Sequence, residues 1–251
     1  HVASQIYEGL VRFNPQDLSI EPALAKSWSI DGSHEVYTFE LRPDVHFQDD
    51  PAFSSGQGRV VTAQDVVDCF SQLCRTDLGG QSSQLFRDRV QGVESAGTTG
   101  EISGLKALDD HKVQVTLTSP CMNFLQVLAE SGCWIWPHEL LSAYGKDLVH
   151  HAIGTGPFMI KATEQEEAIV LVRNEDYWGK DELGGPLPYL DGVRVTFVPD
   201  KEKEVAAFLK CSLSMLTELS LESMDILADT VNGHGHAGAK QFITTTVPAL
   251  A

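Results

Sequence analysis

One short stretch, residues 153–160 (IGTGPFMI), places two glycines and a proline within four positions. Glycine tolerates backbone conformations that other residues avoid, and proline fixes its own φ at about −65°. Apolar residues resume directly at Phe158, so the sequence predicts a tight turn that opens into a strand, with a positive φ at Gly156. A hairpin is expected to follow and to end in the segment 174–179 (NEDYWG).

The same stretch lacks the parts of a phosphate-binding loop. A Walker motif ends in Gly-Lys-Ser/Thr, and a dinucleotide-binding motif needs a third glycine where a helix begins. Here Phe158 and Met159 follow the glycines and are expected to start a strand instead. The pattern therefore favours a structural turn over a nucleotide site.

The composition is typical of a folded domain and excludes some partners. Hydrophobic residues make up 42% of the 251 residues and charged residues 21%, a balance unlike that of disordered or membrane proteins. The net charge of −17 repels nucleic acid backbones and anionic lipid surfaces, although it also serves solubility, which is the simpler explanation. No apolar run approaches the roughly 18 residues of a membrane span.

The cysteines and histidines do not predict a metal site. The five cysteines lack CxxC spacing, and most are expected to be small buried residues; a Cys121–Cys133 bridge stays open as an alternative, since an exported protein would permit it. Neighbouring side chains in the turn 109–111 do not converge on one ion, and His234 and His236 supply at most two ligands. We therefore expect no metal and no cofactor.

Hydrophobic periodicity predicts short strands and helices in a mixed α/β (α+β) chain without a regular βαβ repeat. The helix that begins after Thr62 is expected to carry a near capping box with Asp65, and its buried stripe leaves Cys69 off centre. Helices are expected around residues 2–10, 23–28, 63–74, 120–128, 138–144 and 201–209, and strands around 36–41, 105–108, 113–117, 133–137, 158–173, 193–198 and 240–247.

No arrangement of residues predicts catalysis. His138 with Glu139, and His150 with His151, are neighbours in a helix or a loop and have no adjacent nucleophile. We therefore expect that the protein is not an enzyme and has no catalytic residues.

A collinear set of motifs resembles the family 5 solute-binding proteins of ABC importers, which are oligopeptide, dipeptide and nickel binders. The matches extend over nearly all of the chain, and their order is more specific than any one of them. The segments that carry the resemblance are residues 7–11 (YEGLV), 22–28 (PALAKSW), 37–42 (YTFELR), 60–67 (VVTAQDVV), 154–158 (GTGPF), 173–178 (RNEDYW) and 188–191 (PYLD).

The resemblance implies a type II periplasmic-binding-protein-like lobe with an inserted α+β subdomain. By this comparison residues 1–33 and 152–248 form the core of lobe one, residues 34–151 form the insert, and residues 249–251 begin the crossing to a second lobe that is missing here. An export signal and a first strand are expected upstream of His1. Ligands of such proteins sit between two closing lobes, so one wall of the site is expected here.

The function implied by the resemblance is the extracytoplasmic solute-binding component of an ABC importer. Such a protein is periplasmic or anchored at the cell surface as a lipoprotein, captures a small peptide or similar solute as a monomer, and delivers it to a membrane permease. The alternatives are a ligand-sensing domain of the same fold in a signalling protein and, with less support, a hydrolase. The resemblance places five residues near the ligand, with Glu8 able to meet an ammonium group: Tyr7, Glu8, Phe86, Trp134 and Trp136. The alternative for Trp134 and Trp136, which share one face of the predicted strand, is that both belong to the core.

Overall fold

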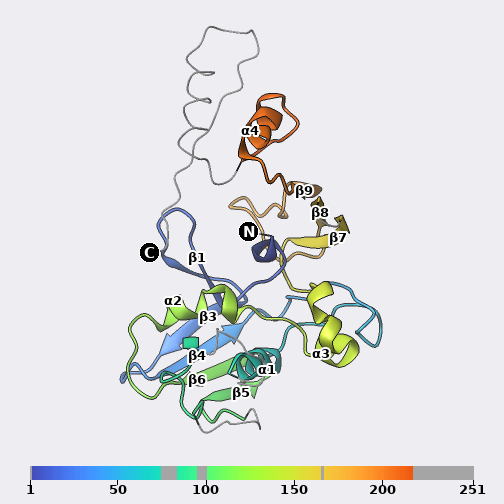
Figure 1. Ribbon diagram of the computed structural model, residues 1–251. Helices are drawn as coiled ribbons and strands as arrows, with labels where there is room; N and C mark the ends of the chain where they lie inside the picture. The colour runs from blue at the N-terminus through green and yellow to red at the C-terminus, as the bar shows by residue number, and fades with distance from the viewer. Residues whose placement is uncertain (1, 75–83, 95–100, 165–166, 217–251) are drawn as a thin grey trace. The chain divides into compact units, whose positions relative to one another are not determined.

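The computed structural model describes residues 2–74, 84–94, 101–164 and 167–216 (Figure 1). These residues form a mixed α/β structure, which confirms the predicted fold class. The helices are α1 (Ala63–Leu73), α2 (Phe124–Leu128), α3 (Glu139–Tyr144) and α4 (Lys201–Leu209). The strands are β1 (Val11–Phe13), β2 (Ile20–Pro22), β3 (Ala25–Ile30), β4 (Val36–Leu41), β5 (Leu105–Asp109), β6 (Lys112–Thr116), β7 (Phe158–Glu164), β8 (Ala168–Arg173) and β9 (Gly192–Thr196).

The chain divides into two compact units. The first unit comprises His1–Lys161 and Leu171–Val193, and the second comprises Ala162–Val170 and Arg194–Ala251. The boundary expected at residue 33 falls in the turn between β3 and β4, which pair in one sheet. The division into a lobe core and an inserted subdomain stays a prediction.

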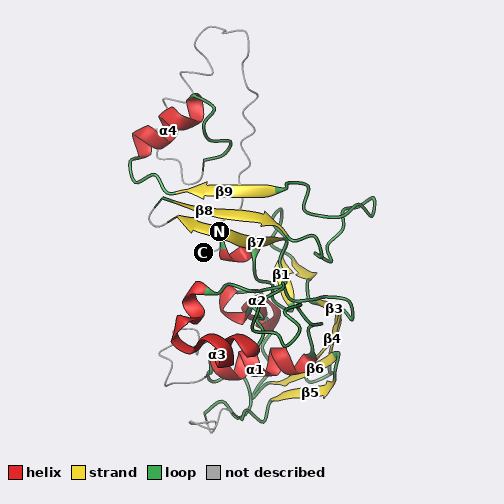
Figure 2. Cartoon of the chain, turned by 90° about the vertical axis from the view of Figure 1, so that its right-hand side faces the viewer, coloured by secondary structure: helices red, strands yellow, loops and turns green. Residues whose placement is uncertain are grey.

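An antiparallel sheet of order β3-β4-β6-β5 forms the hydrophobic centre of the first unit. Tyr37 and Phe39 of β4 pair with Val115 and Val113 of β6, and all four side chains are buried. The alternation predicted for residues 36–41 is therefore confirmed, as is the hairpin formed by β5 and β6. Helix α1 packs on β5 and β6, as Figure 2 shows.

The sequence of α1 accounts for both its start and its buried face. The Thr62 backbone N–H and hydroxyl donate to Asp65 Oδ2 at 2.8 and 2.9 Å, which confirms the predicted cap. Cys69 is a small buried residue, as expected for most of the cysteines, and its thiol donates to the Trp136 carbonyl at 3.1 Å. The buried stripe is wider than expected, since residues 131–136 cover this side of the helix.

Two predicted helices near the start of the chain are wrong. Residues 25–30 form β3, because pairing with β4 outweighs their local helical pattern. In residues 2–10 only the 3₁₀ turn Ala3–Gln5 is helical. Glu8 forms a β-bridge with Ile135, and strand β1 begins at Val11.

The segment 133–137 is extended only in its middle. The 3₁₀ turn Ser131–Cys133 precedes it, and its single β-bridge joins Ile135 to Glu8, so the predicted strand is reduced to one residue. The helix predicted for residues 138–144 is confirmed as α3, which ends at Gly145 with a φ of 52°. Glycine adopts this left-handed conformation without a steric penalty.

The hairpin after the central turn is confirmed, and its strands lie in a sheet of order β7-β8-β9. Within the second unit, Asp200 caps α4 as predicted: its Oδ1 accepts the backbone N–H groups of Glu202 and Lys203 at 3.0 and 3.2 Å. The strand predicted for residues 240–247 and the glycine loop 233–238 lie outside the described residues.

The cysteines of the described chain are free thiols. The proposed Cys121–Cys133 bridge is absent, because each thiol hydrogen-bonds within its own segment: Cys133 donates to the Val127 carbonyl, and Cys121 to Asn123 Oδ1. Burial raises the pKa of the Cys133 thiol to about 12. A thiol in such surroundings is a poor nucleophile.

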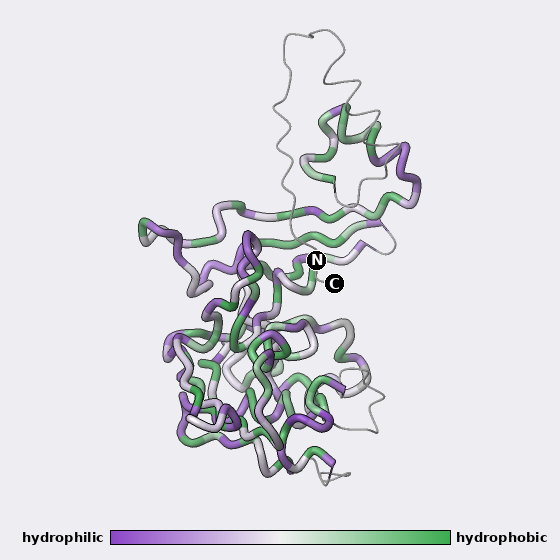
Figure 3. The backbone as a smooth tube through the Cα atoms, turned by 90° about the vertical axis from the view of Figure 1, so that its left-hand side faces the viewer, coloured by the Kyte–Doolittle hydropathy of each residue, from purple (hydrophilic) through white to green (hydrophobic). Residues whose placement is uncertain are grey.

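Hydrophobic and hydrophilic residues follow each other at short intervals along the described chain (Figure 3). Among the described helices, none has the length and apolar character needed to cross a bilayer.

The central turn needs glycine for a reason other than the one predicted. Gly156 does not have a positive φ. A Cβ atom at Gly156 would instead lie 2.5 Å from the Gln5 carbonyl oxygen and 2.7 Å from the Ile6 carbonyl carbon. At Gly154 it would lie 2.1 Å from the Ile6 carbonyl oxygen. The turn therefore lies against the backbone of residues 5–6 at a distance that only glycine permits.

Replacement of Gly156 by alanine should lower the free energy of unfolding by about 2 kcal/mol, because the methyl group forces two backbone segments apart. Urea denaturation followed by circular dichroism measures this loss. Gly32→Ala is the matched control, because nothing lies within 4 Å of a Cβ built at Gly32. Equal midpoints for the two variants would contradict the close-approach explanation.

Candidate functional site

The carboxylate of Glu8 is a buried acid that accepts hydrogen bonds from three different side chains. Its residue is 9% exposed. Its Oε2 accepts hydrogen bonds from Thr155 Oγ1 and Trp178 Nε1, both at 2.8 Å, and its Oε1 accepts one from the Tyr177 hydroxyl at 3.2 Å. Three donors from distant parts of the sequence thus converge on one carboxylate.

Backbone contacts hold Glu8 at this point. The Ile135 N–H donates to the Glu8 carbonyl at 2.9 Å, and the Gly156 N–H donates to the Ile6 carbonyl at 2.8 Å. The Arg42 guanidinium lies 4.2 Å from the centroid of the Trp178 ring. This cation–π contact fixes the indole that donates to Glu8.

Burial raises the pKa of Glu8 above its usual value, and the hydrogen bonds from Trp178, Thr155 and Tyr177 act in the opposite direction, as does the charge of Arg12. The competing effects follow from the geometry: desolvation disfavours the charged form, whereas donors stabilise it. The same burial, together with the Glu8 charge, holds the pKa of the Tyr177 hydroxyl well above its ordinary value.

A cavity of about 340 Å³ opens beside this carboxylate. Tyr7 and Trp134 form one side of it, with their rings stacked at a centroid distance of 6.1 Å and an interplanar angle of 16°. Burial raises the pKa of the Tyr7 hydroxyl. We refer to this cavity as the Glu8 cleft; its lining residues are Ser4, Gln5, Tyr7, Glu8, Gly9, Val11, Arg12, Ala23, Ala129, Trp134, Pro157 and Tyr177.

The structure brings together three of the five residues expected near a ligand. Tyr7, Glu8 and Trp134 line the Glu8 cleft. Phe86 is 0% exposed and packs edge-on against Phe70, so its side chain belongs to the hydrophobic core. Trp136 packs partly against that core and lines a different cavity.

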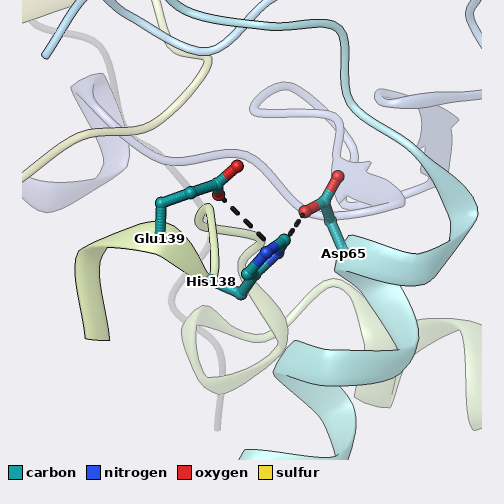
Figure 4. Close-up of side chains that lie close together, drawn as sticks. All are labelled: Asp65, His138 and Glu139. Carbon is teal, nitrogen blue, oxygen red and sulfur yellow. Dashed lines mark ion pairs between the residues drawn. The ribbon is translucent and has the colours of Figure 1, made fainter. Parts of the chain in front are cut away.

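The second cavity, of about 720 Å³, runs along one face of α1. Positions 64, 67, 68, 71 and 72 of the helix line it, with residues 101–106 and the start of α3 opposite. At its edge lies the acidic cluster drawn in Figure 4, in which the side chains of Asp65, His138 and Glu139 point toward one another.

Arg59 occupies the centre of this cluster. Its Nη2 atom lies 2.6 Å from Asp65 Oδ1, 2.9 Å from Glu139 Oε2 and 3.2 Å from His138 Nδ1. Because a guanidinium only donates, His138 Nδ1 accepts at this contact. The guanidinium fills the space that an ion bound by these three side chains would need, so we assign the cluster to an internal ion pair.

Arg59 lowers the pKa of both carboxylates that it contacts. For Asp65, burial acts to raise the pKa, but the Arg59 hydrogen bonds and the Thr62 N–H outweigh it, so the pKa lies below the ordinary 3.8. The pKa of Glu139 is lowered in the same way. Arg59 therefore ties the loop that precedes α1 to both α1 and α3.

The depressed Asp65 pKa predicts acid sensitivity. Its stabilising contribution is complete above the unfolded-state pKa and is lost as the pH falls below about 4, through the folded-state pKa. Chemical denaturation at pH 7 and pH 3 should show a smaller pH-dependent loss of stability in Asp65→Asn than in the unmodified protein. Asp44→Asn, at an exposed acid, is the control and should keep the full loss. An unchanged pH dependence in Asp65→Asn would contradict the assignment.

Four functional neighbours were not found from the sequence. Thr155, Tyr177 and Trp178 reach Glu8 across 147 to 170 positions of sequence, and Gln48 reaches the central turn across 108 to 110. The one available signal was the coincidence of the motifs at residues 7–11, 154–158 and 173–178 in the family resemblance. Their meeting at a single carboxylate was not part of that expectation.

Comparison with known proteins identifies the family. The family described as bacterial extracellular solute-binding proteins, family 5 (middle), matches residues 19–244. The chain belongs to this family. The chain is also similar to the nickel-binding periplasmic protein of Escherichia coli K12, which is 28% identical over 85% of this chain and 36% of its own length. The dipeptide-binding protein of the same strain is 29% identical over 82% of this chain and 37% of its own.

Solved structures of periplasmic and oligopeptide-binding proteins are similar in fold to this chain. The periplasmic binding protein DppA from Helicobacter pylori, in complex with the peptide STSA, matches with a TM-score of 0.71 and 28% identity over 90% of this chain and 43% of that one. Haemophilus influenzae OppA, at 22% identity and a TM-score of 0.78, has the same fold. The chain spans a little over a third of the length of the curated relatives it matches.

Proposed function

We propose that the protein is the extracytoplasmic solute-binding component of an ABC importer and captures peptides or similar small solutes. Family membership supports a binding role over a catalytic one, since the relatives named above are binding proteins. In this proposal the protein acts as a monomer in the periplasm or at the cell surface and delivers its solute to a membrane permease.

The observation that carries the proposal to particular residues is the Glu8 cleft. Stacked aromatic rings offer a large contact surface at low cost in side-chain entropy, and a buried carboxylate beside them favours a ligand with a positive group. Tyr7, Trp134 and Glu8 supply these features on one wall. The hydrogen bonds to Glu8 all come from protein groups. In this proposal Glu8 therefore acts on a ligand by electrostatic attraction across the cleft, and Tyr177, which donates to Glu8 and also lines the cleft, offers its hydroxyl oxygen to the ligand.

The two tryptophans distinguish the Glu8 cleft from the cavity along α1. In the whole protein that contains this chain, Trp134→Ala should weaken binding of a mixed pool of di- to pentapeptides at least tenfold by isothermal titration calorimetry, because it removes one of the stacked rings. Trp136→Ala should cost about 3 kcal/mol of unfolding free energy, since the ring packs against the core, and should leave affinity within about twofold.

These measurements test the position of the site and the proposed solute class separately. Peptide binding that is weakened by Trp136→Ala and unaffected by Trp134→Ala would move the site to the cavity along α1. If the unmodified protein binds no member of the pool, the proposed solute class is wrong. Melting temperatures for both variants show whether a loss of binding reflects unfolding. The expectation that these 251 residues carry one wall of the site stays a prediction.

A further inference from the structure

Two buried amide side chains hold the central turn from outside. Gln48 Nε2 donates to the carbonyls of Phe158 and Gly156 at 2.8 and 3.3 Å, and Asn174 Nδ2 donates to the Gly156 carbonyl at 2.9 Å. The Gln48 backbone N–H donates to the Gly154 carbonyl at 2.9 Å. Gln48 is 3% exposed and Asn174 is 6% exposed, so neither amide is satisfied chiefly by water.

This turn presents a single donor to Glu8. Thr155 is buried, and its hydroxyl reaches Glu8 Oε2 at 2.8 Å. The neighbouring glycines lie against residues 5–6, directly before Tyr7 and Glu8. The amides therefore determine where the Thr155 hydroxyl lies relative to the carboxylate.

Asn174 also starts the segment that brings two further donors to the same carboxylate. Its Oδ1 accepts the Asp176 N–H at 3.2 Å, and its carbonyl accepts the Tyr177 N–H at 3.2 Å. Tyr177 and Trp178 follow and donate to Glu8. One side chain thus contacts the turn with its nitrogen and the aromatic segment with its oxygen.

The two ends of the Gln48 side-chain amide differ in their hydrogen bonding. Its Nε2 makes two bonds, whereas its Oε1 is buried and has no partner. An orphaned buried acceptor is unfavourable. The orientation of the amide is therefore fixed by what its nitrogen donates to, which is the turn.

We propose that Gln48 and Asn174 are positioning residues for the Glu8 cleft: they clamp the Gly154–Phe158 turn so that Thr155 holds the Glu8 carboxylate in place. Neither residue lines the cleft, so they act through Thr155 and Glu8. The proposal rests on the proposed function only in taking this cleft to be the ligand site.

The clamp can be tested without a ligand. Trp178 Nε1 donates to Glu8, so its indole N–H resonance in a ¹⁵N-labelled sample reports protonation of that carboxylate across a pH series. Trp178→Phe identifies the resonance. Asn174→Asp removes the donor to the Gly156 carbonyl and keeps the acceptor for the Asp176 N–H. Gln48→Met removes both side-chain hydrogen bonds of Gln48 to the turn with little change in shape.

Loss of the clamp should weaken the bond from Thr155 and shift the titration midpoint of the indole resonance upward by about half a pH unit or more, because Glu8 loses a donor that favours its charged form. Thr155→Val should produce the same shift, and Thr155→Ser should restore the original midpoint. Gln16→Glu, on the exposed turn between β1 and β2, is the control for added charge and should leave the midpoint unchanged.

Double variants decide whether the amides act through Thr155. If they do, adding Thr155→Val to Asn174→Asp or to Gln48→Met should shift the midpoint no further than either single change. Additive shifts, or an unchanged midpoint in both folded single variants, would overturn the proposal. Peptide titration is a separate experiment: if the variants show the expected NMR shifts but the unmodified protein binds no peptide, the proposed function is contradicted and the clamp still stands.

Discussion

A single buried charge organises this structure. The Glu8 carboxylate lies out of water, where an unpaired charge is costly, and the protein meets that cost with a hydroxyl, an indole and a phenol. These donors come from the central turn and from the segment after β8, so the ends of the first unit's sequence meet at one point. The Arg42 ring contact and the glycines of the turn support this arrangement, since each fixes the position of a donor or of the backbone beside it.

Local chemistry made part of this fold predictable. The Thr62–Asp65 cap, the alternation of Tyr37 and Phe39, and the Asp200 cap depend on residues close in sequence, and all three are present. Residues 23–28 have a helical pattern, but residues 25–30 form a strand, because their partner strand lies beyond the turn. Local propensity has no access to such a partner. For the same reason, the sequence did not show that the strand predicted for residues 133–137 would be reduced to one bridge, between Ile135 and Glu8.

Sequence analysis identified some residues of the candidate site but not the contacts that join them. Tyr7, Glu8 and Trp134 were identified through family resemblance, and they share a cleft. Phe86 has the same aromatic character but faces the core, since residue type does not specify the direction of a side chain. Sequence analysis correctly marked Gly156 as a position that needs glycine, but for the wrong reason. Glycine is needed because the turn contacts the backbone of residues 5–6, about 150 positions away, and a side chain would not fit between them. Both differences arise from tertiary packing.

The extended segment 134–136 borders two cavities at once. Ile135 is fully buried and is tied to the Glu8 backbone, while the indoles on either side of it line different spaces. A thiol on α1 further pins the carbonyl of Trp136. The segment is therefore a shared wall with fixed supports, and it cannot slide toward one cavity without withdrawing from the other.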